Sequence, residues 1–259
     1  MKDLSICIVN YNTPDLTSKC IESIQKHTKD INYEIIVVDN ASKDKSVKIL
    51  KERFGAGIKL ITERSNRFFS GGFNAAFSIS EGRYCLILNS DAYIEDNAFL
   101  PMTNFLDSHP EAGAVTGCIV DIESRKITQT ATMELTQNLE WIRSKRILRM
   151  IFNRAFGAYI YSNWNRESDK QIEVACDAFL MVRKDILELV GGYNEAMKLY
   201  YTEEYLSDKI RELKFTIWHL AAARVMHAWS SSTKKSKKSW INAIYQTDKI
   251  LYFCQKYGR

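Results

Sequence analysis

The sequence predicts an α/β protein built on an open sheet flanked by helices. Over residues 4–88, apolar runs typical of strands alternate with segments whose apolar residues recur at helical spacing. This alternation is typical of an open α/β sheet. The run Glu34–Val38 is almost wholly apolar, which indicates a strand buried on both faces. Hydrophobic residues make up 46% of the 259 residues, which is enough for a sizeable core and too many for a disordered chain.

The first third of the sequence contains four expected strands with helices between them. Thr13 and Pro14 form a helix start, with a capping side chain and a proline at the first helical position. Ser42 stands at the capping position of the second helix, and a loop ending at Gly71 and Gly72 precedes the third. The expected strands are Leu4–Val9, Glu34–Val38, Ile58–Thr62 and Tyr84–Leu88, and the third helix is Asn74–Ser80.

After Asp91 the regular alternation stops. The pattern predicts strands over Ala114–Asp121 and Val174–Val182. It predicts helices over Ala98–Ser108, Gln137–Ile160, Asp185–Val190, Glu203–Lys214 and Trp240–Tyr257. The last of these is a helical C-terminal extension of the domain.

The cysteines and the N-terminus indicate where the protein works. Six cysteines occur singly, without a CxxC pair, and those at 7, 20 and 85 fall in apolar strand or helix patterns. Buried thiols in a reducing compartment fit this better than a disulfide framework. The chain enters a strand directly, without a secretory signal, and no run approaches the roughly 18 apolar residues of a membrane span. We therefore expect a cytoplasmic protein.

Polar side chains follow three of the expected strands. They are Asn10-Tyr11-Asn12 after the first strand, Asp39 after the second and Asn89-Ser90-Asp91 after the fourth. In an open parallel sheet, ligands bind beyond the carboxyl ends of the strands. Asp and Asn are also common in ordinary turns, but three such clusters at one sheet edge predict a ligand site.

Asp91 is the strongest metal candidate among them. It follows five residues, Tyr84–Leu88, that offer almost no polar atoms, so its carboxylate needs a cation, a ligand or a turn to satisfy it. Mg²⁺ and Mn²⁺ prefer oxygen ligands and keep open positions for phosphate. Such an ion would bridge a diphosphate and absorb the charge of a leaving group.

An ordered set of motifs now becomes apparent along roughly 230 of the 259 residues. The chain resembles glycosyltransferase family 2, and within it the bacterial branch of predicted rhamnosyltransferases. The motifs are Val9-Asn10-Tyr11-Asn12, Val37-Val38-Asp39-Asn40-Ala41-Ser42, Asn66-Arg67-Phe68-Phe69-Ser70-Gly71-Gly72-Phe73-Asn74, Leu88-Asn89-Ser90-Asp91, Val182-Arg183-Lys184, Gly191-Gly192-Tyr193-Asn194-Glu195, Tyr201-Thr202-Glu203-Glu204 and His227.

The resemblance implies a GT-A fold, a Rossmann-like mixed sheet, and a transfer that inverts the sugar's anomeric carbon. It implies that Asp39 reads the base or ribose of a nucleotide, with Asn10 and Asn12 nearby. Asp91 then corresponds to the metal-binding Asp of a DxD motif whose first position here is Asn89, with Ser90 between them on the donor side. His227 matches a late His that contacts metal or diphosphate.

The loop motif adds four donor-side residues. Asn66, Gly71, Gly72 and Asn74 are expected to contact the donor, because glycine lets the backbone approach a ligand closely. The alternative is that the two glycines form an ordinary turn.

Glu203 and Glu204 stand where the family has Glu-Asp. An inverting transfer needs one carboxylate to remove the proton of the acceptor hydroxyl, and Glu204 occupies that position. The alternative is that both glutamates only stabilise a helix N-terminus. Two departures concern this acceptor side: Leu206 replaces an acidic residue, and Ala228-Trp229-Ser230 replaces glycine-rich residues.

The net charge of +5 is unevenly placed, with two segments strongly basic. Residues 143–166 contain six basic residues and no acidic one, and residues 230–259 contain seven against Asp248. Basic residues mixed with apolar ones are typical of a helix on an anionic membrane, so residues 143–166 and 234–240 are candidates for peripheral contact with the inner face of the cytoplasmic membrane. A solvated charged face and self-association into a homo-oligomer are the alternatives. No RNA-binding motif accompanies the charge, so nucleic acid is not an expected partner.

Taken with the resemblance, the chain divides into three expected parts. Residues 1–229 form the transferase domain, with a nucleotide-sugar-binding half (1–92) and an acceptor half (93–229) that carries a basic helical insertion near 137–166. Residues 230–259 form the C-terminal helix. The expected donor is dTDP-rhamnose or a UDP-sugar, with Mn²⁺ or Mg²⁺, and the expected acceptor is a glycan or lipid-linked glycan of bacterial surface polysaccharide. The alternative function is a non-catalytic protein that binds nucleotide sugars or acts as a scaffold.

Overall fold

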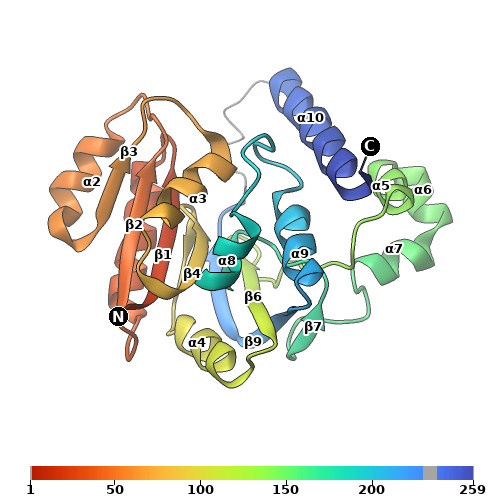
Figure 1. Ribbon diagram of the computed structural model, residues 1–259, viewed down its shortest axis with the longest axis horizontal. Coiled ribbons are helices and arrows are strands. Elements are labelled where there is room, and N and C mark those ends of the chain that lie inside the picture. Colours follow the sequence, from red (N-terminus) through yellow and green to blue (C-terminus); the bar gives the residue numbers. More distant parts are fainter. Residues whose placement is uncertain (1, 230–237, 259) are drawn as a thin grey trace.

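The computed structural model describes residues 2–229 and 238–258. The described strands form one nine-stranded sheet with the order β3-β2-β1-β4-β8-β6-β9-β5, and β7 also pairs with β9 (Figure 1). The strands are β1 (Lys2–Asn10), β2 (Tyr33–Asp39), β3 (Lys59–Thr62), β4 (Gly82–Asn89), β5 (Ala92–Tyr93), β6 (Ala112–Asp121), β7 (Lys170–Ile172), β8 (Phe179–Arg183) and β9 (Thr216–His227). The expected open mixed sheet is therefore present.

The strand directions bring the chemistry to one edge of the sheet. Strands β1, β2, β3 and β4 are mutually parallel. Strand β8 runs antiparallel to β4 and β6, and β9 runs parallel to β6. Strands β6 and β9 therefore point the same way as β1 and β4, and their carboxyl ends lie at the same edge. Asn10, Asp39, Asn89 and His227 are the last residues of β1, β2, β4 and β9.

Helices cover both faces of the sheet (Figure 1). One face packs against α1 (Pro14–His27), α2 (Ser46–Phe54) and α4 (Phe99–Ser108), and the other against α3 (Phe68–Ser78), α8 (Lys184–Val190) and α9 (Thr202–Glu212). Successive side chains of a strand point to opposite faces. Accordingly Leu86 and Leu88 of β4 pack on the first face, while Cys85 and Ile87 pack on the second.

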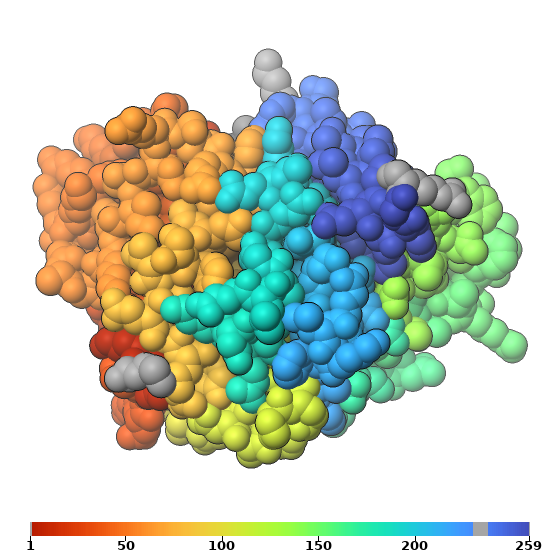
Figure 2. Space-filling view, in the orientation of Figure 1, coloured from red at the N-terminus to blue at the C-terminus, as the bar shows by residue number. Residues whose placement is uncertain are grey.

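A third cluster forms at one end of the molecule. It joins α5 (Gln137–Ser144), α7 (Asn153–Tyr159) and α10 (Lys238–Tyr257) to the segment that leads into α9. Its aromatic residues include Tyr201, which stacks on Tyr252 of α10 with ring centroids 5.4 Å apart. Helix α6 (Arg146–Ile151) lies beside α5 and α7. Figure 2 shows the surface of α10 next to that of these helices.

Several predicted elements need correction. Helix α3 begins at Phe68, so Gly71 and Gly72 lie inside a helix and not at the end of a loop. The predicted strand Val174–Val182 is strand only from Phe179. The predicted helix Gln137–Ile160 consists of three short helices, and strands β5, β7 and β9 were not predicted.

The two predicted helix caps are also wrong, for the same physical reason. The Thr13 hydroxyl donates to Asn10 Oδ1 (3.3 Å) and does not cap α1. The Ser42 hydroxyl accepts from the Asn12 N–H (2.9 Å), while Asp44 Oδ1 accepts from the Ser46 N–H at the start of α2 (2.9 Å). In both cases the hydroxyl takes part in a network between loops that are distant in sequence.

The described helices contain none that is both long enough and apolar enough to cross a membrane. All six cysteines are free, and only Cys254 is exposed. The buried thiols at 7, 20 and 85 pack in the core as expected.

Candidate functional site

Asn10 and Asp39, predicted from separate motifs, form one buried network. They are partners in the register of β1 and β2, and the Asn10 amide donates to Asp39 Oδ2 at 2.7 Å. Asp39 Oδ1 accepts from the Ser42 N–H at 3.0 Å, so both carboxylate oxygens are engaged within the protein. Asn12, with φ 56°, accepts from the Lys43 N–H through its side chain (2.7 Å). The network thus fixes the loops after β1 and β2.

Asp91 and His227 meet at the same edge, although 136 residues separate them in sequence. Asp91 Oδ1 lies 3.2 Å from His227 Nε2, and the two side chains are 11% and 2% exposed. The Asn89 amide lies 3.0 Å from the same ring nitrogen. The Trp229 N–H donates to His227 Nδ1 at 3.1 Å, which places the proton of the neutral ring on Nε2, facing Asp91.

The residues around Asp91 suit a divalent ion that accepts both oxygen and nitrogen ligands. One carboxylate and one imidazole fit Mn²⁺ better than Mg²⁺, which prefers oxygen ligands alone. A metal on Nε2 requires the ring proton to move to Nδ1, and the Trp229 N–H then loses its acceptor. Ser90 stands between Asn89 and Asp91, with its hydroxyl 3.5 Å from that of Thr13.

A pocket of about 340 Å³ opens over these residues. This volume falls within the range of small-molecule sites. Its lining combines the Asn89-Ser90-Asp91 tripeptide and His227 with side chains from the loops after β1, β2 and β3 and from α10. The lining residues are Val9, Tyr11, Asn40, Asn66, Phe68, Phe69, Phe73, Asn89, Ser90, Asp91, Leu199, Tyr200, His227, Trp229 and Trp240.

Phe68 forms one wall of the pocket in a strained conformation. Its φ of 59° is unusual for a bulky residue. The Asn66 side chain accepts from the Phe68 N–H (2.7 Å), and the Asn40 amide donates to the Phe68 carbonyl (2.7 Å). The Trp240 ring stacks against the Phe68 ring at 5.9 Å. Trp240 therefore faces this pocket, while residues 234–237 of the predicted basic segment lie outside the described residues.

Gly71, Gly72 and Asn74 lie behind this wall and not on the pocket surface. A Cβ on Gly72 would come within 2.8 Å of the Val9 side chain, and one on Gly71 within 2.6 Å of Arg67 Cβ. Asn74 donates to the Tyr193 carbonyl (2.8 Å) and accepts from the Tyr193 N–H (2.9 Å). Gly72 lets α3 pack closely on β1, Gly71 leaves room for the Arg67 side chain, and Asn74 anchors the loop after α8.

Asp177 connects the end of β4 to the start of α9. The Asn89 N–H donates to the carbonyl of Ala178, the residue after Asp177 (3.1 Å). Asp177 Oδ2 accepts from the Thr202 hydroxyl (2.7 Å). Thr202 is the first residue of α9, followed by Glu203 and Glu204. Asp177 could not be identified from sequence, because it lies in a segment whose pattern predicts a continuous strand.

Three carboxyl groups gather at this junction, and burial raises the pKa of each. Burial raises the pKa of Asp177 to about 7, with the charge of Glu204 adding to the effect. Burial, followed by the charges of Glu204 and Asp177, raises the pKa of Glu203 well above its ordinary value. Burial also raises the pKa of Glu204, but Arg143 opposes that shift. Glu204 is thus the member of the group best placed to remain ionised.

Arg143 on α5 supplies that cation. Its Nη1 lies 2.9 Å from Glu204 Oε1, and its guanidinium also pairs with Glu140 and donates to the Tyr159 hydroxyl. Glu204 is 3% exposed, so this ion pair is buried. The basic insertion therefore reaches the catalytic candidate Glu204 directly, a link that sequence patterns do not reveal.

One further group of side chains has the spacing of a metal site. Ligand atoms of Cys176, Asp177 and Glu203 lie within 4.8 Å of one another. Burial raises the pKa of the Cys176 thiol well above its ordinary value, so the thiol remains protonated. A protonated sulfur does not suit Mg²⁺ or Mn²⁺, and the Asp91–His227 pair is the better metal candidate.

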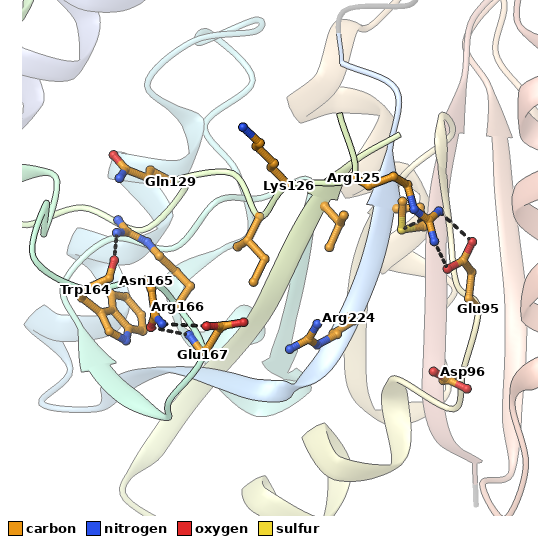
Figure 3. Close-up of a pocket in the computed structure, with 13 residues that line it drawn as sticks. Glu95, Asp96, Arg125, Lys126, Gln129, Trp164, Asn165, Arg166, Glu167 and Arg224 are labelled. Atoms are coloured by element: carbon orange, nitrogen blue, oxygen red, sulfur yellow. Dashed lines mark hydrogen bonds and ion pairs between the residues drawn. The ribbon is translucent and has the colours of Figure 1, made fainter. Parts of the chain in front are cut away.

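A second cavity, of about 550 Å³, lies alongside the carboxyl-terminal halves of β6 and β9 (Figure 3). Met226, next to His227 in sequence, lines it. Arg125 pairs with Glu95 on one side of the cavity at 3.0 Å, and Arg166 lies on the opposite side with Lys126 between them. Both acidic and basic groups face this cavity, which suits a ligand with many hydroxyl groups better than a strongly charged one.

The curated proteins to which the chain is similar include two poly(ribitol-phosphate) glycosyltransferases. It is 27% identical over 210 residues to a poly(ribitol-phosphate) beta-glucosyltransferase of Bacillus spizizenii, covering 78% of this chain and 31% of that protein. It is 28% identical over 115 residues to the Staphylococcus aureus poly(ribitol-phosphate) beta-N-acetylglucosaminyltransferase TarS, covering 42% of this chain and 20% of that protein. The chain thus spans about a third of the length of the first of these relatives, and less of the second.

Solved structures confirm the GT-A fold. The crystal structure of GalNAc-T7 with UDP, GalNAc and Mn²⁺ matches with a TM-score of 0.66 at 13% identity, covering 88% of this chain and 44% of that chain. The structure of S. aureus TarS in complex with UDP matches with a TM-score of 0.60 at 18% identity, covering 88% and 61%. The glycosyl transferase family 2 model matches residues 5–191. The chain belongs to glycosyl transferase family 2.

Proposed function

We propose that this chain is an inverting glycosyltransferase that moves a sugar from a UDP-linked donor to a saccharide of a cell-envelope polymer. The observation that carries the proposal is that the Asp91–His227 pair lies at the sheet edge to which the start of α9, which bears Glu204, is tied. The tie consists of the hydrogen bonds from Asn89 to Ala178 and from Thr202 to Asp177. The names of the relatives support a UDP-linked glucose or N-acetylglucosamine over dTDP-rhamnose, which is the alternative donor.

In this proposal the donor occupies the pocket bounded by Phe68 and Trp240. Tyr11 and Asn66 line the part next to the loops after β1 and β3, where the nucleotide would lie, with the Asn10–Asp39 network holding those loops in place. Asp91 and His227 would hold Mn²⁺, or Mg²⁺ with more oxygen ligands from the donor. When bound, the ion offsets the charge that builds up on the diphosphate as the sugar leaves.

Glu204 would act as the base of the transfer. A general base must be ionised before it accepts the proton of the acceptor hydroxyl. The Arg143 guanidinium favours the ionised form of Glu204. Burial raises the pKa values of Glu203 and Asp177, so these two neighbouring carboxyl groups hold their own protons more strongly. This division gives the cluster one basic carboxylate.

The acceptor is proposed to extend from Glu204 towards the polar cavity of Figure 3. That cavity is lined by Lys126, Gln129 and Asn165 as well as by carboxylates. Amides, carboxylates and cations together provide donors and acceptors for the hydroxyl groups of a glycan or lipid-linked glycan.

The test is an assay of the purified chain with UDP-glucose, UDP-N-acetylglucosamine and dTDP-rhamnose, each with Mn²⁺ or Mg²⁺. We expect metal-dependent UDP release from a UDP-sugar. Asp91→Ala should abolish metal-dependent UDP binding in calorimetry. Asp185→Asn, which changes an exposed carboxylate on α8, should leave UDP binding intact.

Two results would redirect the proposal. UDP binding without any hydrolysis or transfer, even with saccharide acceptors, would favour the non-catalytic alternative. Unchanged metal-dependent binding in Asp91→Ala would remove Asp91 from the metal site.

Leu206, one of the departures from the family pattern, lies fully buried among core residues.

A further inference from the structure

Helix α6 and its neighbours leave a set of large apolar side chains in water. Ile147, Met150 and Ile151 of α6 are 71%, 69% and 65% exposed, and Phe152 directly after the helix is 43% exposed. Large apolar side chains exposed together mark an interaction surface. The Trp141 ring on α5 lies 6.3 Å from that of Phe152. The apolar end face, as we name it, consists of Trp141, Ile147, Met150, Ile151, Phe152 and Ile250.

Helix α10 extends this surface. Ile250 is 60% exposed and lines a shallow groove with Trp141 and Lys145 of the neighbouring segment. The groove measures about 520 Å³. The apolar end face is therefore built from two segments distant in sequence, and it lies at the end of the molecule formed by α5, α6 and α10 (Figure 1).

The charged residues of the segment that carries most of the face are all basic. From Trp141 to Arg166 the sequence has six basic residues and no acidic one. Arg143 and Arg166 are engaged inside the protein, the first with Glu204 and the second with backbone carbonyls. Lys145, Arg146 and Arg154 remain exposed around the face.

We propose that the apolar end face docks on a membrane of anionic lipids. Apolar side chains enter the boundary between headgroups and acyl chains, while basic residues attract the negative surface. The docking rests on its own geometry. Only the role of the docking, which is to bring a lipid-linked acceptor to the site, rests on the proposed function.

A second copy of the chain is a poorer occupant of this face. A two-fold contact would place the same patch on both sides of the interface. Lys145, Arg146 and Arg154 would then face their own copies, and like charges brought together at an interface oppose association. An anionic lipid surface satisfies the same charges.

The face is also connected to the catalytic candidates. Arg143 on α5 bonds Glu204 at 2.9 Å. The Tyr245 hydroxyl of α10 donates to Glu140 on α5 at 2.9 Å, and Tyr201 donates to Tyr245 at 2.9 Å. A bilayer that holds α5 and α10 therefore holds the segment that positions Glu204.

The test is sedimentation of the full chain with phosphatidylcholine vesicles, with and without phosphatidylglycerol. We expect binding to the anionic vesicles that exceeds binding to neutral ones by at least about tenfold and falls at high salt. Arg146→Gln and Arg154→Gln should each lower the partition coefficient by roughly fivefold.

A double variant tests the apolar part. Ile147→Ser with Ile151→Ser should lower anionic-vesicle binding by at least about tenfold. Leu189→Ser is the matched control, because Leu189 is 70% exposed but lies on α8. The control should bind vesicles like the wild type. Thermal melting of all variants should match the wild type, since the altered side chains are exposed.

Three outcomes would overturn the docking. They are no vesicle binding by the wild type, equal binding to neutral and anionic vesicles, and wild-type binding by the double variant. A wild-type dimer that the double variant converts to a monomer, without vesicle binding, would assign the face to a second copy. UDP release from a donor without vesicles is measured on the same samples. Its absence in the wild type would contradict the proposed function and leave the vesicle result standing.

Discussion

Arg143 and Glu204 form a buried ion pair that decides how charge is distributed among the acidic side chains at the start of α9. The guanidinium also pairs with Glu140, so one cation serves two buried carboxylates. Removing one partner of a buried pair leaves an uncompensated charge, which costs more than the pair contributes. The pair thus links the stability of the acceptor half to the ionisation of the proposed base.

Arg143→Met should lower the free energy of unfolding by on the order of 3 kcal/mol, because Glu204 loses its cation and Glu140 keeps only Lys249, at 3.7 Å. Urea denaturation measures the change. Restoring neutrality in the triple variant with Glu140→Gln and Glu204→Gln should recover most of the loss. Equal stability of Arg143→Met and the wild type would show that the pair is not formed in solution.

Asp177 should make stability depend on pH. Its folded pKa of about 7 lies above the ordinary value of 3.8. Between these two pH values the folded state therefore holds a proton that the unfolded state releases. The stability this group contributes is present below about pH 4 and is lost as the pH rises through 7.

Asp177→Asn should remove that dependence, because an amide resembles the protonated acid and still accepts from Thr202. The free energy of unfolding at pH 8 relative to pH 5 should then be less reduced than in the wild type. Denaturation at the two pH values gives the comparison, with Asp185→Asn as control. Identical pH profiles for wild type and Asp177→Asn would contradict the raised pKa.

At this scale the sequence predicts residues that follow strands and misses residues that act through tertiary partners. Asn10, Asp39 and Asp91 were found because polar side chains at strand ends meet at one sheet edge. Asp177 and Arg143 were not found, because their roles depend on Thr202 and Glu204, which lie 25 and 61 residues away.

At the scale of elements, α10 holds the segment that leads into α9. Asp248 is fully buried, and its Oδ2 accepts from the N–H groups of Leu199 and Tyr200 at 2.9 and 3.0 Å. Both residues line the pocket proposed for the donor, and Tyr201 follows with φ 59°. The Asp248 carboxylate therefore fixes the backbone directly before Tyr201, and so helps to hold Tyr201 in its strained conformation.

Asp248→Ala should cost on the order of 3 kcal/mol of unfolding free energy, because two buried N–H groups lose a charged acceptor. It should also weaken UDP binding, since the pocket wall at Leu199 and Tyr200 is released. Urea denaturation and calorimetry measure the two effects. Thr247→Ala, an exposed neighbour, should change neither, and wild-type values for Asp248→Ala would show that α10 does not support the pocket.

Strand β9 shows why an element can escape sequence reasoning. Its sequence, Thr216–His227, has three consecutive alanines and mixes polar with apolar residues, so it lacks a clear period of two. Burial between β6 and β5 makes it a strand. Helix α3 was misjudged at its start for a related reason. Two glycines disfavour a helix in isolation, but Gly72 is required by its close packing on Val9 and Gly71 by its contact with Arg67.

For the whole molecule, the sheet order explains how a site forms from distant segments. Asn10 and Asp39 end β1 and β2, Asn89 ends β4, and His227 ends β9 on the other half of the sheet. The sequence predicted the α/β class and the mixed sheet through alternation and resemblance. It could not predict that the basic helices would pack beside the catalytic candidates, because that contact is made by side chains far apart along the chain.

The most direct test of the account is Glu204→Gln, assayed for UDP binding and for sugar transfer on the same protein. Glutamine keeps the shape of the side chain and a hydrogen bond with Arg143 but cannot accept the acceptor's proton. We predict that calorimetry shows UDP affinity within about twofold of the wild type, while transfer falls by at least about 100-fold. Transfer at the wild-type rate, with UDP bound normally, would contradict the assignment of Glu204 as the base.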